Sequence, residues 1–99
     1  MISIKKYKQG NDLLVAACDE KLLGKKFEEG KFQIDVKKDF YGGEKITIKV
    51  FQKFLEDATI ANLVGPETIK AAVEMGLVDP ETVIEIKGVP HAQMVRMIL

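Results

Sequence analysis

Two polar side chains near the end of the chain have the spacing of a small chemical site. His91 and Gln93 stand two residues apart, directly after Pro90. Proline lacks an N–H and disfavours helix at the residue before it, so this stretch is extended or a turn. Side chains two apart in a strand point to the same face. His91 is the only histidine, and an imidazole with a reference pKa of about 6.5 could act as a general base.

Asn62 is a second candidate, because it interrupts the otherwise apolar run 59–64. A buried amide must be hydrogen-bonded or it destabilises the fold. Asn62 could bond exposed backbone at a bulge or turn, or it could pair with His91 or Gln93 across a sheet. The second arrangement would form a polar cluster able to bind a small ligand.

A general base also needs a nucleophile or a substrate beside it. Cys18 and Ser3 are the only thiol and serine hydroxyl, and Cys18 ends an apolar run where an unreactive thiol is expected. The sequence contains no phosphate-binding loop, dinucleotide motif or zinc-protease motif, and no cysteine–histidine cluster for structural zinc. We therefore predict no catalytic residue, no metal site and no cofactor. A hydrogen-bonded, structural role is the more common one for a single histidine such as His91.

A third candidate is the double glycine in Tyr41-Gly42-Gly43, which we expect in a loop over residues 39–43. The preferred interpretation is a tight turn closed by aromatic side chains. The alternative is a bare backbone that a ligand or partner can approach closely.

Apolar patterning predicts the strands that must position these residues. They cover residues 2–7, 13–18, 31–37, 59–64, 83–87 and 91–99. Phe32 and Ile84 are expected to point inward from their strands, Asp19 to cap a helical turn at 19–24, and residues 27–30 to form a turn.

Two helices complete the expected fold. One runs over about 48–58 with Thr47 as its N-cap, and the other begins at Pro66 and is stopped by Gly76. Strands joined by hairpins at both ends of the chain, with two helices between, predict an α+β, two-layer fold. Its sheet is mixed and mostly antiparallel, with about six strands, and the whole of 1–99 forms a single domain.

The net charge of zero hides an asymmetry between the two halves of the chain. Residues 1–53 hold twelve lysines against eight acidic residues, and residues 54–99 hold three basic residues against seven acidic ones. A basic face in the first half could meet an anionic partner, although lysines also commonly line the solvent side of strands. The candidates for one basic surface are Lys5, Lys25, Lys26, Lys37 and Lys38.

The cysteine count and the length of the apolar stretches also indicate where in the cell the protein is expected. A single cysteine cannot form an internal disulfide, which favours a cytoplasmic protein. No apolar stretch approaches the roughly 20 residues of a membrane span, so no membrane is expected as a partner.

Four segments in order resemble a known family: 18–27, Asp39-Phe40-Tyr41-Gly42-Gly43, 58–65 and Gly88-Val89-Pro90-His91-Ala92-Gln93. Together they are similar to the uncharacterised archaeal family called domain of unknown function 424. The resemblance implies a small cytoplasmic archaeal protein without an established enzyme activity. Its members are grouped loosely with predicted RNA-binding or translation-associated proteins, and no site residues are agreed for the family.

Three functions therefore stay open. The first is an RNA- or ribonucleoprotein-binding module using the lysines. The second is an enzyme or small-ligand binder using Asn62, His91 and Gln93 in a pocket beside the double glycine. The third is a homodimer through the C-terminal strand, because Met94–Leu99 is apolar on both faces. We favour binding over catalysis.

Overall fold

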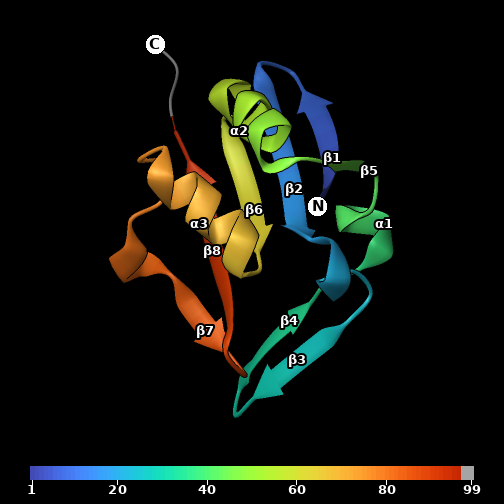
Figure 1. The fold of residues 1–99 in the computed structure, drawn as a ribbon, viewed down its shortest axis with the longest axis vertical. Coiled ribbons are helices and arrows are strands. Elements are labelled where there is room, and N and C mark those ends of the chain that lie inside the picture. The colour runs from blue at the N-terminus through green and yellow to red at the C-terminus, as the bar shows by residue number, and fades with distance from the viewer. Residues whose placement is uncertain (97–99) are drawn as a thin grey trace.

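A six-stranded sheet organises the chain, as the computed structural model shows for residues 1–96 (Figure 1). The strand order is β5-β1-β2-β6-β8-β7, and a separate hairpin pairs β3 with β4. The strands are β1 (Ile2–Gln9), β2 (Asp12–Asp19), β3 (Lys26–Glu29), β4 (Phe32–Asp35), β5 (Glu44–Ile46), β6 (Ile60–Val64), β7 (Ile84–Ile86) and β8 (Val89–Val95). The helices are α1 (Lys38–Tyr41), α2 (Ile48–Asp57) and α3 (Pro66–Glu74), with short 3-10 turns η1 (Glu20–Leu22) and η2 (Pro80–Thr82).

The sheet is mixed, as its patterning predicts. Only β2 and β6 pair in parallel, and every other pair among the described strands is antiparallel. The α+β class, the six-stranded mostly antiparallel sheet and the terminal hairpins are therefore confirmed, but the predicted strand 31–37 lies outside this sheet as β4 of the separate hairpin, and β5 is the sixth strand. None of the helices within residues 1–96 is long and apolar enough to cross a membrane.

Two cores lie on opposite faces of the sheet. Helices α2 and α3 cover one face (Figure 1), where Phe51 and Leu55 are fully buried against strand residues such as Leu63. On the other face, α1 and the β3–β4 hairpin bury Cys18 and Val64 at one end only. The rest of that second face has no covering layer among the described residues, and we call it the open face.

Local signals set the helix ends as expected. The Thr47 hydroxyl accepts a hydrogen bond from Val50 N at 3.3 Å, which satisfies one free donor of the first turn of α2. Pro66 occupies the first turn of α3, where its missing N–H costs nothing. Gly76, with a φ of +74°, follows the end of that helix.

Several local expectations were wrong, each for a physical reason. Residues 27–29 are strand in place of a turn, because Lys26–Glu29 pairs with Phe32–Asp35 as a hairpin despite carrying one apolar residue, and only Gly30 lies in the turn. Residues 38–41 form a helical turn in place of a loop. Phe32 and Ile84 are 64% and 52% exposed, because the hairpin tip and β7 face a hollow of about 430 Å³ between them. The expected strand 91–99 begins at Val89, and residues 97–99 lie outside the described part of the chain.

Candidate functional site

Asn62 and Gln93 form a hydrogen-bonded amide pair on the open face. They are directly opposite each other on β6 and β8, and Gln93 Nε2 donates to Asn62 Oδ1 at 2.9 Å. Pairing across the sheet, one of the two arrangements open from the sequence, is the one present. The pair is partly solvent-exposed, so its remaining amide donors and acceptor can reach a ligand.

His91 lies two residues before Gln93 on β8, opposite Val64 on β6 and Ile84 on β7. A hollow of about 310 Å³ is lined by Thr82, Ile84, His91, Ala92 and Gln93. His91 and Gln93 therefore share a face and a concavity.

Burial lowers the pKa of His91 below the ordinary histidine value of 6.5. We expect the single imidazole resonance in an NMR titration to move with a midpoint below 6.5. Between about pH 6.5 and the lower folded pKa, the folded state binds fewer protons than the unfolded chain. The free energy of unfolding is therefore highest above pH 6.5 with respect to this group, and it decreases as the pH falls to the folded pKa. A midpoint at or above 6.5 would mean that the ring is solvated or faces an acidic group.

Neither of the two candidate nucleophiles, Cys18 and Ser3, lies beside this histidine. Cys18 and His91 both lie opposite Val64, so strand β6 separates them by about 10 Å of backbone. Burial and then the charge of Asp19 raise the pKa of Cys18 to about 12, which keeps the thiol protonated. The Ser3 hydroxyl is buried and donates to the Tyr41 carbonyl at 3.0 Å. Within the described residues no group of three acidic, cysteine or histidine side chains could hold a metal ion.

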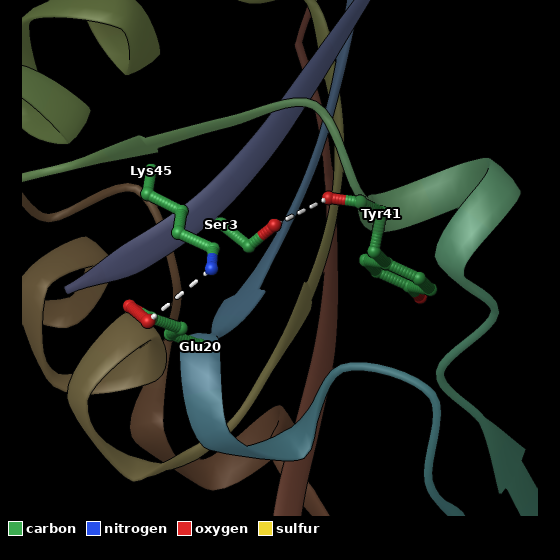
Figure 2. Close-up of polar contacts among 4 residues, drawn as sticks. All are labelled: Ser3, Glu20, Tyr41 and Lys45. Atoms are coloured by element: carbon green, nitrogen blue, oxygen red, sulfur yellow. Dashed lines mark hydrogen bonds and ion pairs between the residues drawn. The ribbon is translucent and has the colours of Figure 1, made fainter.

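The double glycine serves the packing of α1 and β5 against β1. Figure 2 shows the Tyr41 carbonyl directed toward Ser3, and nearby Lys45 pairs with Glu20 at 3.5 Å. A Cβ on Gly43 would lie 2.5 Å from the Ile4 carbonyl oxygen, and one on Gly42 would lie 2.5 Å from the carbonyl oxygen of Lys38.

Tyr41 belongs to this packed region as well. Its side chain is only 6% exposed, and burial, followed by the charge of Cys18, raises the pKa of Tyr41 to about 12. Three strands, β1, β2 and β6, separate this region from β8. The expected pocket uniting the double glycine with Asn62, His91 and Gln93 is thus not brought together.

Four of the five candidate lysines lie in the segments at the base of the β3–β4 hairpin and the start of α1, and the fifth, Lys5, reaches α1 with its side chain. Val36 N donates to Lys25 O at 2.9 Å, which places Lys25 and Lys26 on the segment paired with the one leading to Lys37 and Lys38. From β1, Lys5 Nζ donates to the Asp39 carbonyl in α1 at 2.8 Å. We call these five residues the basic surface: Lys5, Lys25, Lys26, Lys37 and Lys38.

Acidic groups reduce the charge of the basic surface only in part. Lys26 pairs with Glu28 at 3.2 Å, and both side chains are largely exposed, so solvent screens this pair. Asp35 lies opposite Lys26 in the hairpin, and Asp39 directly follows Lys38 in the chain. Among the described residues the other four lysines of the basic surface make no ion pair, so their charges are available to an anion.

Sequence reasoning missed the role of Asp19. Its side chain does not cap η1, but accepts from Glu67 N, Thr68 N and the Thr68 hydroxyl at 3.1, 2.9 and 2.8 Å. This carboxylate caps α3 from a residue almost fifty positions away. One signal was present, since Gly65-Pro66 starts a helix without any capping side chain of its own.

Comparison with known proteins points to one family. Residues 7–97 match the family described as a protein of unknown function, DUF424. The chain belongs to this family. A crystal structure of an uncharacterised conserved protein from the archaeon Methanopyrus kandleri resembles this DUF424 fold with a TM-score of 0.76. The two chains are 22% identical, and the match covers 99% of this chain and 96% of that one. No curated protein matches.

Membership confirms the resemblance inferred from the four sequence segments. At 22% identity the likeness to the M. kandleri protein shows a shared fold.

Proposed function

We propose that this DUF424 protein is a small RNA- or ribonucleoprotein-binding module, in keeping with the translation-associated grouping that the family resemblance implies. The observation that carries the proposal is the gathering of Lys5, Lys25, Lys26, Lys37 and Lys38 around α1. Four of these lysines are exposed, and the fifth is half-buried. Because lysine contacts a phosphate as a mobile point charge, such a surface suits a sequence-tolerant grip on the backbone.

The aromatic residues around the basic surface limit which nucleic acid would fit. Phe40 stacks on Tyr7 with ring centroids 5.4 Å apart, and the Tyr7 hydroxyl donates to the Phe40 carbonyl at 2.8 Å. Lys5 Nζ lies 5.6 Å from the Tyr7 ring centroid. Because these rings pack against one another, their faces are less available to bases. We therefore expect lysine–phosphate contacts to contribute more to RNA affinity than base stacking does.

The small-ligand alternative rests on the hollow beside His91 and Gln93. Its polar groups could orient a ligand, with a neutral imidazole as donor or acceptor. The geometry favours binding over catalysis there, because Cys18 and Ser3 are both buried and do not reach this hollow.

We expect this protein to bind a mixed-sequence single-stranded RNA oligonucleotide with an affinity that falls steeply with salt. About four lysine–phosphate contacts predict a slope of about −3 in a plot of log K against log salt concentration. In the double variant Lys25→Glu/Lys37→Glu, affinity should fall about tenfold or more, and the slope should become shallower by roughly 1.4, because two phosphate contacts are lost. Fluorescence anisotropy at several salt concentrations measures both quantities.

The matched control is Lys49→Glu/Lys70→Glu, which makes the same charge change on exposed positions of α2 and α3. It should leave the affinity within about twofold of that of the unchanged protein. Equal losses in the two double variants would mean that only net charge matters, and a slope near zero would rule out the basic surface as an RNA interface.

A further inference from the structure

Strand β8 is longer than the neighbour on its outer side. Its seven residues pair with β6 over Val64 to Ile60, but β7 pairs only with Val89, Pro90 and His91. Along Ala92–Val95, no strand within residues 1–96 lies on the side away from β6. This stretch of β8 is therefore a free edge, by which we mean that its outer side has no partner strand among the described residues.

The hydrogen bonds between β8 and β6 identify which backbone N–H and C=O groups of the free edge point outward. Pro90 O accepts from Gly65 N at 2.9 Å, and Arg96 N donates to Thr59 O at 2.8 Å. Even-numbered residues of β8 thus direct their backbone groups toward β6, and odd-numbered residues direct them the other way. The N–H and C=O groups of Gln93 and Val95 consequently point outward, past the end of β7.

The usual protections of an edge are absent from this stretch. Edge strands are commonly blunted by lysine, proline or a bulge, whereas residues 92–95 are Ala-Gln-Met-Val, paired with β6 in unbroken register. Val95 is 74% exposed on the open face. The space where β7 would continue is the hollow of about 310 Å³ beside Ala92 and Gln93, so an added strand has room to begin there.

We propose that a second copy of this chain occupies the free edge, with the two β8 strands pairing antiparallel about a two-fold axis at Met94. Gln93 of each copy would lie opposite Val95 of the other, and each of these pairs would exchange two backbone hydrogen bonds. The same segment supplies both sides of the contact, because its outward groups repeat at Gln93 and Val95 with a single residue between them. Any strand edge can pair in this way, and a second copy is favoured because its exposed Val95 would lie beside the exposed Ile84 of this chain.

The neighbouring elements set the extent of this interface. Ile84 of β7 already pairs with His91, so the intermolecular ladder is limited to residues 92–96. Val95 would gain an apolar neighbourhood beside Ile84, which is itself 52% exposed. The basic surface lies toward the other side of the sheet, around β1 and α1, and would stay accessible in both copies. The proposal of a dimer is therefore independent of the proposal of RNA binding, and each can fail without the other.

The test is the molar mass in solution of nuclease-treated protein, measured by sedimentation equilibrium over a wide range of concentrations. We expect a monomer–dimer equilibrium for the unchanged chain, weakened about tenfold or more by Val95→Lys, which places a charge at the contact. Gln93→Pro should act similarly, because the N–H that it removes faces away from β6. Circular dichroism identifies any variant that has lost its fold.

Val50→Lys is the matched control, since Val50 is an exposed apolar residue on α2. It should leave the dimer unchanged. A monomer at every concentration would overturn the proposal, as would a dimer that withstands both β8 substitutions while remaining folded. A dimer weakened by Val50→Lys and not by Val95→Lys would overturn it too, by placing the contact on the helical face.

Discussion

Replacing Asp19 by alanine should lower the free energy of unfolding by about 3 kcal/mol. The carboxylate is 1% exposed and accepts three hydrogen bonds from the start of α3. Losing a helix cap costs about 0.5–2 kcal/mol, and buried donors left without a partner add about 1–3 kcal/mol. Chemical denaturation, monitored by circular dichroism, gives the two free energies directly.

Asp79→Ala is the matched control, since it removes a cap of the same chemistry at the surface. Asp79 Oδ1 accepts from Glu81 N at 2.9 Å at an exposed position before η2. We expect this variant to lose about 0.5–1 kcal/mol. Equal losses in the two variants would show that water replaces Asp19 at the α3 N-terminus, and that the connection from β2 to α3 contributes little stability.

The framework of the fold could be predicted because its signals are local. Alternation in β1, the apolar runs of β2 and β6, and Pro66 at the start of α3 each depend on neighbours a few residues away. Phe32 shows the limit of such signals. It keeps the alternation of its strand, but it stands at the hairpin tip, where nothing packs on that face. Periodicity tells which side chains share a face, and only the tertiary arrangement tells whether that face is covered.

The same difference between local and tertiary signals applies to the candidate site. Asn62 and Gln93 were found because an amide in an apolar run needs a partner, and their register confirmed one of the two arrangements that the sequence left open. Asp19 was assigned to the nearest turn because its true partners, Glu67 and Thr68, are close only after β2 and β6 pair in parallel. No local rule connects residues so far apart in the chain.

Gly43→Ala should destabilise the protein by about 2 kcal/mol or more, although Gly43 requires no positive φ. The added Cβ would meet two backbone atoms of β1, the Ile4 carbonyl oxygen at 2.5 Å and the Lys5 Cα at 3.3 Å. Neither atom can move without disturbing the β1–β5 pairing, in which Ile4 lies opposite Glu44. Overpacking of this kind typically costs about 1–3 kcal/mol, and thermal or chemical denaturation measures the loss.

Gly30→Ala separates the steric cause from the general cost of replacing glycine. Gly30 has a φ of +60° at the hairpin tip, and a Cβ added there would meet no atom within 4 Å, so its replacement strains only the backbone, by about 1 kcal/mol. A loss at Gly43 well above that at Gly30, with RNA affinity of the folded variant unchanged, would establish the double glycine as a packing element of α1 and β5. Equal losses of stability in the two variants would mean that β5 shifts easily to make room for the added Cβ. A Gly43→Ala variant that folds normally but binds RNA more weakly would instead make the bare backbone a point of ligand approach.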